Sequence, residues 1–138
     1  MRLGAALATA VAFPLLAAGG SDRITLAPFV GTWYGHTRSL TIRETGVAKE
    51  SISDGCCDLV VRLTVRLSRP RRVGDSVVAT ATVVRARTYD PSAFEPGHPP
   101  PRVGDRGRFA LRRGIITEQL TETTYCNARA SRFGRCGA

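Results

Sequence analysis

The chain has few of the residues from which catalytic and metal sites are usually built. Among its 138 residues there are two histidines, His36 and His98, one tryptophan and one methionine. A hydrolytic triad needs a histidine base between a nucleophile and an acid, and a zinc site needs cysteines and histidines at ligand spacing. The sequence shows neither pattern, so we expect no catalytic residue, no metal and no cofactor. A hydrolase that uses His36 at the rim of a barrel is the remaining enzymatic alternative.

Aromatic side chains are also scarce, at 7% of the residues. Proteins that bind single-stranded nucleic acid interleave aromatic rings with basic residues so that the bases can stack. Basic residues do cluster here, at Arg69, Arg71 and Arg72, at Arg112 and Arg113, and at Arg129, Arg132 and Arg135. Because aromatic residues are so few, these clusters favour contact with a generic anionic surface over specific binding of nucleic acid.

Lysine is nearly absent, with Lys49 as the single example, although the formal net charge is +9. A charge of this size favours anionic partners such as phosphate, an acidic polysaccharide or a negatively charged cell envelope. The excess of arginine over lysine is also expected in a protein encoded by a genome rich in G and C, in which case the arginines are solvated surface residues without a specific partner. Both interpretations stay open at this point.

Long apolar runs are missing after the first twenty residues. Residues 1–20 begin with one basic residue, continue with an uncharged stretch that contains Pro14, and end in small residues. This order is typical of a secretory signal peptide, and the run is shorter than the roughly 20 apolar residues of a membrane span. Gly19 stands where a lipoprotein signal has its cysteine. We therefore expect residues 1–20 to be removed, leaving one domain, residues 21–138, that is secreted or held in the cell envelope as a monomer.

The four cysteines, Cys56, Cys57, Cys126 and Cys136, all lie in the exported part. Cysteines outside the cytoplasm usually form disulfides. A bond between the neighbours 56 and 57 would close a strained ring, so we favour links from each of these two to the C-terminal pair. The local Cys126–Cys136 loop is the main competitor. Either pairing staples the C-terminal tail to the domain.

Apolar and polar residues alternate over much of the chain, as strands with one buried face require. The clearest case begins at Leu59 and reads LVVRLTVRLS. Residues 77–88 are equally rich in β-forming side chains, but their parity slips near Val83–Val84, as a β-bulge causes. Further strands are expected at residues 29–34, 39–44, 47–53 and 107–112, and one or two at 115–125. No segment has a sustained helical period.

Turn-forming residues separate these strands at short intervals. Glycines at the turns suit hairpins between neighbouring strands. Residues 90–101 contain five prolines and are expected to form one exposed, stiff loop, while residues 127–135 can form at most two helical turns. The pattern predicts an all-β protein, an antiparallel up-and-down meander of seven to eight strands in a closed or nearly closed β-barrel. A β-sandwich is the alternative.

The motif Gly31-Thr32-Trp33-Tyr34 resembles the Gly-x-Trp signature of the calycin superfamily, which includes lipocalins, fatty-acid-binding proteins and avidins. The resemblance implies a calycin-like barrel in which Trp33 closes one end and stacks against an arginine of the last strands. The candidates for that arginine are Arg108, Arg112 and Arg113. The sequence departs from the avidin pattern, because Gly35 and His36 follow the motif and there is no second tryptophan. Biotin binding is therefore not implied.

A second resemblance spans most of the mature chain. The signal peptide, the first strand, Leu40-Thr41-Ile42, residues 114–117 and the ending Cys136-Gly137-Ala138 are similar to small uncharacterised secreted proteins of actinobacteria. This resemblance supports a secreted, disulfide-bonded domain and implies no chemistry.

The barrel prediction assigns an inner face, which either packs solid or encloses a small apolar molecule. Its expected residues are Val30, Leu40, Ile42, Leu59, Val61, Leu63, Val65, Phe109 and Leu111. The tentative ligand contacts are Trp33, Tyr34, His36, Leu63, Val65, Phe109 and Leu111. Glu118 and Glu122 are expected to be solvent-exposed charges rather than a glycosidase pair. The leading hypothesis is a non-catalytic barrel that binds a small apolar ligand, and the alternative is an envelope-binding or anionic-polymer-binding protein with an arginine-rich surface.

Overall fold

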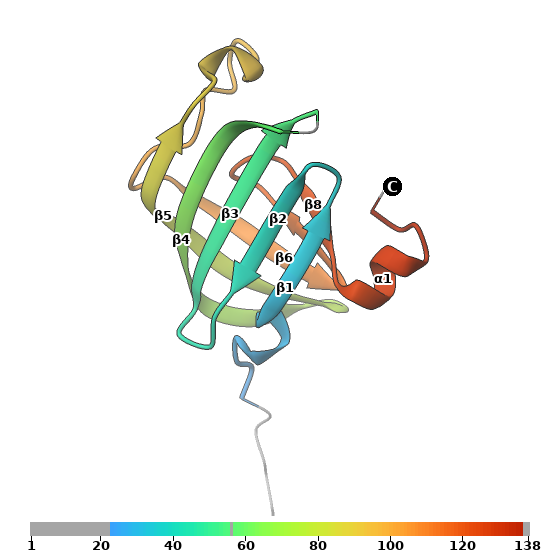
Figure 1. The fold of residues 1–138 in the computed structure, drawn as a ribbon. Helices are drawn as coiled ribbons and strands as arrows, with labels where there is room; N and C mark the ends of the chain where they lie inside the picture. Colours follow the sequence, from blue (N-terminus) through green and yellow to red (C-terminus); the bar gives the residue numbers. More distant parts are fainter. Residues whose placement is uncertain (1–22, 56, 137–138) are drawn as a thin grey trace, which may run out of the picture.

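Eight antiparallel strands close into one barrel in which each strand pairs with its neighbours in the sequence and β1 also pairs with β8 (Figure 1). The structure is a computed structural model that describes residues 23–55 and 57–136. The strands are β1 (Gly31–Gly35), β2 (Arg38–Ile42), β3 (Val47–Asp54), β4 (Asp58–Val73), β5 (Ser76–Thr88), β6 (Arg106–Arg112), β7 (Ile115–Glu118) and β8 (Thr124–Cys126). The predicted up-and-down barrel is confirmed, and the sandwich alternative is wrong.

Three short helical segments accompany the barrel. They are the 3-10 helices η1 (Ala27–Phe29) and η2 (Pro91–Ala93) and the α-helix α1 (Ala128–Arg132). Asn127 caps α1 by accepting a hydrogen bond from the Ala130 amide at 2.8 Å, as expected for a helix start. The helix confirms the one or two turns predicted for residues 127–135. None of the described helices is long and apolar enough to cross a membrane.

The long β4–β5 pair contains the bulge that the sequence pattern predicts. Thr64 pairs with Arg85 while Val65 pairs with Val83, which leaves Val84 as an extra residue in the ladder. Side chains alternate between the two faces of a strand, so one extra residue exchanges the faces beyond it. The inward positions before the bulge have odd numbers, whereas the arginines after it, also at odd numbers, point outward.

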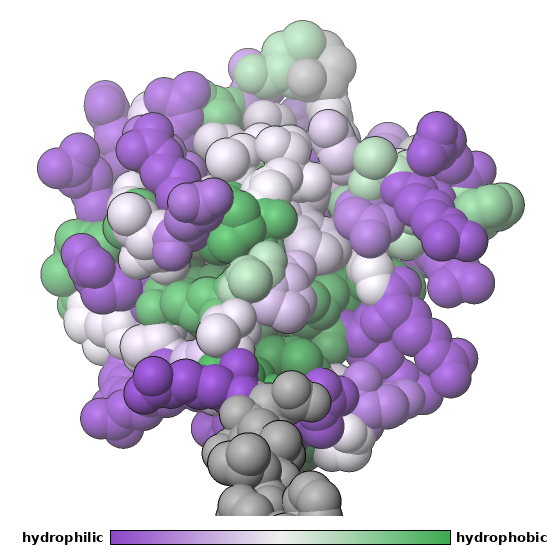
Figure 2. All heavy atoms as spheres, turned by 90° about the horizontal axis from the view of Figure 1, so that it is seen from below, coloured by the Kyte–Doolittle hydropathy of each residue, from purple (hydrophilic) through white to green (hydrophobic). Residues whose placement is uncertain are grey.

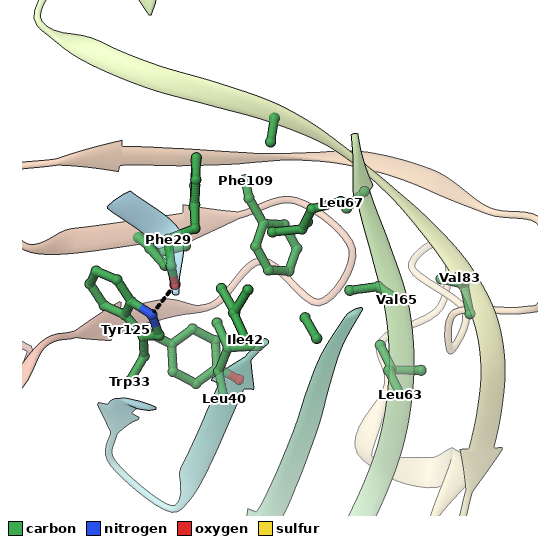
Figure 3. Packing of buried hydrophobic residues seen from close by; sticks show 14 of the residues in the cluster. Phe29, Trp33, Leu40, Ile42, Leu63, Val65, Leu67, Val83, Phe109 and Tyr125 are labelled. Atoms are coloured by element: carbon green, nitrogen blue, oxygen red, sulfur yellow. Dashed lines mark hydrogen bonds between the residues drawn. The ribbon is translucent and has the colours of Figure 1, made fainter. Parts of the chain in front are cut away.

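The barrel interior is a continuous packed cluster of apolar side chains (Figure 3). Of the nine residues predicted on the inner face, six are buried: Leu40, Ile42, Val61, Leu63, Val65 and Phe109. Val30, Leu59 and Leu111 are partly exposed, and Leu111 packs against the cluster from its edge. The predicted inner face is therefore correct for the residues at the centre of the barrel, but it included three residues that are only partly buried.

Trp33 plugs one end of the barrel, which we call the closed end. Its side chain is 4% exposed, and its indole Nε1 donates a hydrogen bond of 2.8 Å to the carbonyl oxygen of Phe29 in η1 (Figure 3). Buried indole nitrogens normally need such a partner. Seen from this end, hydrophilic side chains crowd the outside of the barrel and hydrophobic ones show between them nearer the middle (Figure 2).

The arginine predicted to stack on Trp33 is not found in the described part of the chain. Arg108 donates to the side-chain oxygen of Gln119 at 3.3 Å, and Arg112 donates to Asp75 at 2.6 Å. The third candidate, Arg113, lies in the turn between β6 and β7 and is exposed. The carbonyl of Phe29 replaces the expected cation as the polar partner of the indole. Membership of the calycin superfamily stays a prediction.

The C-terminal tail is stapled by a disulfide between Cys126 and Cys136, whose Cα atoms are 5.8 Å apart. This bond contradicts the favoured pairing, in which Cys56 and Cys57 were to reach the C-terminal pair, and selects the local competitor. The reason is proximity along the chain, because α1 turns the tail back onto the end of β8. Cys57 is also disulfide-bonded. Cys56 and the predicted signal peptide lie outside the described residues.

The end opposite Trp33 is the mouth of the barrel. It carries the β1–β2 and β3–β4 turns, the proline-rich loop between β5 and β6, and the β7–β8 turn (Figure 1). The proline-rich loop is mainly exposed, as predicted, although Phe94 is partly buried and packs against the core cluster. The loop therefore covers part of the mouth while its tip stays in solvent.

Candidate functional site

The residues predicted to contact a ligand do not assemble around one site. Trp33, Leu63, Val65 and Phe109 are buried in the same packed cluster. Leu111, Tyr34 and His36 are partly or fully exposed on different strands and turns. The four buried side chains fill the barrel that they were expected to line.

A basic groove instead lies on the outer face of β3, β4 and β5. It is a hollow of about 500 Å³. We call basic groove the site formed by Lys49, Ser51, Arg62, Thr64, Arg85, Arg87 and Tyr89. Glu50 and Leu63 also line this hollow, although both residues are buried. The four cationic side chains in it are all exposed.

The strand register brings these cations together from three separate segments. Arg62 on β4 pairs directly with Arg87 on β5 and, on its other side, with Ser51 on β3. Thr64 in the same way lies between Lys49 and Arg85. Directly paired residues lie about 4.5–5.5 Å apart at their Cβ atoms. The groove is therefore two cross-strand rows, each carrying two cations and one hydroxyl residue.

The charges of the basic groove are not neutralised by the protein. The one ion pair among the described residues joins Arg112 to Asp75, outside the groove. Within the groove, the Arg87 guanidinium lies 4.7 Å from the centre of the Tyr89 ring, an arrangement that orients the cation without cancelling its charge. Like charges on directly opposite positions of a sheet repel each other. A multivalent anion would relieve this repulsion.

Sequence reasoning missed the basic groove for a definite reason. The predicted clusters were runs along the chain, whereas Lys49, Arg62, Arg85 and Arg87 are far apart in the sequence and meet through strand pairing. The alternation after Leu59 did predict that the Arg62 side chain points outward, and the change in alternation near Val84 was also visible in the sequence. What the sequence alone does not supply is the register that sets these positions side by side.

A second basic site joins two of the predicted clusters. Arg113, from the β6–β7 turn, lines a hollow of about 490 Å³ together with Arg129 and Arg135 from the C-terminal segment. Phe133 lies in the same hollow and is 71% exposed. The Cys126–Cys136 disulfide holds this segment next to the barrel. The structure thus brings Arg113 of one predicted cluster next to Arg129 and Arg135 of another.

Two buried carboxyl groups lie inside the barrel below the mouth. Glu118, at the end of β7, is 1% exposed. Its carboxylate accepts hydrogen bonds from the amides of Leu120 at 2.7 Å and Thr121 at 3.0 Å, and from the Thr123 hydroxyl at 2.6 Å. The Thr121 hydroxyl also donates to it. Glu118 therefore holds the β7–β8 turn together.

Glu50, on the inner face of β3, accepts hydrogen bonds at only one of its two carboxyl oxygens. It is 1% exposed, and its Oε1 accepts from the hydroxyls of Tyr125 at 2.5 Å, Thr121 at 3.2 Å and Thr123 at 3.3 Å. Its Oε2 has no hydrogen-bond partner among the described residues. Burial of a polar atom without a partner costs free energy, so such an atom needs an explanation.

The surroundings of Glu50 favour its neutral form. Burial, the largest cause, and the nearby carboxylate of Glu118 raise the pKa of Glu50 from 4.5 to a net value of about 7, against the opposing effect of the hydrogen bonds from Tyr125 and the two threonines. Burial also raises the pKa of Tyr125, whose hydroxyl therefore stays a donor. The Arg38 guanidinium lies 5.8 Å from the Tyr125 ring centre, but its Nε donates to the Thr124 carbonyl.

The positions of Glu118 and Glu122 correct the sequence prediction that both are solvent charges. Glu118 is buried, whereas Glu122 is exposed in the β7–β8 turn, where its φ is 56°. The strand ends at Glu118 and the turn changes the direction of the chain, so a spacing of four residues no longer places both on one face. The described residues contain no group of three or more histidine, cysteine or acidic side chains that could hold a metal ion.

Comparison of the chain with protein-family models, with curated proteins and with solved structures finds no match to any of them. The basic groove and the barrel mouth are therefore the features of the described residues that bear on function.

Proposed function

We propose that this protein is a secreted, non-catalytic β-barrel that binds an anionic polymer or the anionic surface of the cell envelope through the basic groove. One observation carries the proposal: Lys49, Arg62, Arg85 and Arg87 meet on one outer face with no carboxylate in ion-pair contact among the described residues. Exposed cations on a rigid sheet need little rearrangement to meet repeated negative charges.

The shape of the basic groove supports an extended ligand with several charges. Its two cross-strand rows are offset along β4, so the cations follow the strands instead of converging on one point. Ser51 and Thr64 add hydroxyl groups beside them. Sulfate, phosphate or carboxylate groups repeated along a chain would satisfy this arrangement better than one small anion.

The packed interior gives less support to the rival proposal, a carrier of small apolar molecules. That proposal relied on Trp33, Leu63, Val65 and Phe109 facing a cavity, and these side chains pack in one cluster. The extracytoplasmic location is supported by the signal-peptide pattern of residues 1–20 and by the Cys126–Cys136 disulfide, because disulfides persist in oxidising compartments.

Retention on heparin–agarose tests the proposal, with heparin as a model sulfated polymer. The test variant replaces Arg62, Arg85 and Arg87 by glutamine. The matched control replaces Arg69, Arg71 and Arg72, which are also exposed but do not line the groove, and so removes the same net charge. Both are compared with the unmodified protein on a sodium chloride gradient.

We expect the groove variant to elute at clearly lower salt than the control variant. The slope of its log affinity against log salt should become shallower by about 1 for each arginine–sulfate interaction that the substitutions remove. Equal elution of the two variants would show that net charge alone governs binding, and the groove would then have no special role.

A further inference from the structure

One hollow at the mouth of the barrel is lined by acidic residues, in contrast to the basic character of the chain as a whole. A hollow of about 500 Å³ lies there between the β3–β4 hairpin, the proline-rich loop and the β7–β8 turn. The acids Asp54, Glu95 and Glu122 line it. No arginine or lysine is among its lining residues, and His98 is the single ionisable base. In a chain with a net charge of +9, this hollow is a local acidic region.

Glu50 lies one layer below this acidic hollow. Ile52, two residues further along the inner side of β3, lines the hollow, and side chains two apart on a strand face the same way. Thr121 and Thr123 also line it, and their hydroxyls contact Oε1 of Glu50 at 3.2 and 3.3 Å. Oε1 of Glu50 is therefore separated from the hollow by one shell of side chains, and the neighbouring Oε2 has no partner among the described residues.

Within the described residues, the hydrogen-bond network contains no cation. Glu118 uses amide and hydroxyl donors of the β7–β8 turn, and Glu50 receives the Tyr125 hydroxyl. Neither carboxyl group forms an ion pair within the described chain. A buried charge is normally paired, and an unpaired one destabilises the fold. A ligand that brings a positive charge with N–H donors would supply what Glu50 lacks.

The remaining lining of the hollow defines the other half of such a ligand. Val60, Phe94 and Ile52 contribute apolar surface to the lining. Pockets that combine apolar walls with a few polar groups select ligands with an apolar body and a correctly placed polar group. An ammonium group suits the acidic side better than a metal ion does, because the described acids form no cluster suited to metal coordination.

We propose that the barrel mouth binds a small organic cation, a primary amine with an apolar body, whose ammonium group pairs with Glu50 while its body packs against Ile52, Val60 and Phe94. The side chains of Thr121 and Thr123 give way to admit the ammonium group. The rim acids Asp54, Glu95 and Glu122 attract the cation to the entrance. The ammonium would approach Glu50 from the inner side of β3, whereas the basic groove lies on the outer face, so amine binding does not depend on anion binding in the groove.

Calorimetric titration with three matched probes tests the site. The probes are hexylamine, hexanol and hexanoate, which share an apolar chain and differ in the charge of the head group. At pH 8 the amine is protonated and Glu50 is largely ionised. We expect hexylamine to bind at least about tenfold more tightly than hexanol, since removal of a charged pair costs about one such factor. Hexanoate should not bind.

Two variants locate the binding. Glu50→Gln keeps the size of the side chain and removes its charge, and it should weaken hexylamine binding about tenfold. Glu44→Gln is the matched control, because Glu44 is an exposed acid in the β2–β3 turn at the closed end. It should leave the affinity unchanged. Thermal melting monitored by circular dichroism shows whether both variants remain folded.

A third variant tests the position of the ligand without touching the carboxyl network. Ala93 is exposed and lines the hollow, so Ala93→Trp should fill the entrance and reduce hexylamine binding in a fully folded protein. The proposal is overturned if hexylamine shows no binding at millimolar concentration, if hexanol binds equally well, or if Glu50→Gln binds hexylamine as the unmodified protein does. The last result would place any binding at the rim acids alone.

Discussion

The basic groove and the carboxyl network below the mouth both bring like-charged residues together, but the groove exposes them to solvent and the network buries them. In the groove, Arg62 and Arg87 lie on directly paired positions and both are exposed. Below the mouth, Glu50 and Glu118 are each 1% exposed. Water and salt screen the repulsion between the arginines, whereas the repulsion between the buried acids is reduced by hydrogen bonds and by proton uptake at Glu50. The exposed charges remain available for a partner, while the buried Glu50 becomes sensitive to pH.

The largest effect that we expect from this difference in burial is a pH dependence of the free energy of unfolding, caused by Glu50. Its pKa is about 7 in the folded protein and 4.5 ordinarily, so its protonation favours the folded state. The contribution is fully present below pH 4.5, declines as pH rises, and is lost above pH 7. The free energy of unfolding should fall by about 3 kcal/mol across this interval from this group.

Urea denaturation of the unmodified protein and of Glu50→Gln, at pH values from 4 to 8, measures this effect. The difference between the two free energies of unfolding isolates Glu50, because the other titrating groups are common to both proteins. We expect the difference to change over the interval from pH 4.5 to 7 and to be constant on either side. A difference independent of pH would contradict a buried, perturbed Glu50.

A smaller effect is expected from removing the second buried charge. Glu118→Gln should lower the pKa of Glu50, because repulsion by Glu118 contributes to the raised value. Burial contributes more than this repulsion, so the substitution should remove less than half of the rise that burial and repulsion cause together. The same denaturation series, run on Glu118→Gln, reports the new midpoint.

The control for this prediction is Glu122→Gln, since Glu122 is exposed in the adjacent turn. It should leave the midpoint of the Glu50 transition where it was. If Glu122→Gln moved the midpoint as far as Glu118→Gln does, the effect would come from the general field of the mouth and not from the buried pair.

The smallest effect is expected in the basic groove. Arg62→Gln removes one of two like charges on paired positions, so the free energy of unfolding should rise, on the order of a few tenths of a kcal/mol at low salt. The rise should vanish in high salt, because exposed charges are screened. Urea denaturation at two salt concentrations measures it. A decrease in stability, or a gain that persists at high salt, would mean that Arg62 makes contacts beyond its charge.

Much of the fold was predictable because its signals are local. The alternation after Leu59 marks β4, and the parity slip at Val83–Val84 marks the bulge that the register confirms. Burial of Trp33 followed from a single motif, although its partner proved to be the carbonyl of Phe29 and not an arginine. The disulfide pairing was wrong where the prediction depended on which distant segments meet.

The candidate sites were much less predictable. Glu50 sits among β-forming residues in β3 with the charged neighbour Lys49, and nothing local shows that it points inward. Glu118 was assigned to solvent because the sequence does not show where β7 ends. Both residues become informative only when β3, β7 and β8 close around the same interior.

The strand content, the positions of most turns and the apolar residues that fill the barrel follow from the sequence, because alternation and turn chemistry act over a few neighbouring residues. Which charges share a surface, and which are removed from water, depends on how the strands pair and close. The β4–β5 register places Arg62 opposite Arg87, and closure of the barrel brings Glu50 within hydrogen-bond distance of the Tyr125 hydroxyl. Electrostatic free energies depend on these through-space distances and on burial, and neither is set by separation along the chain.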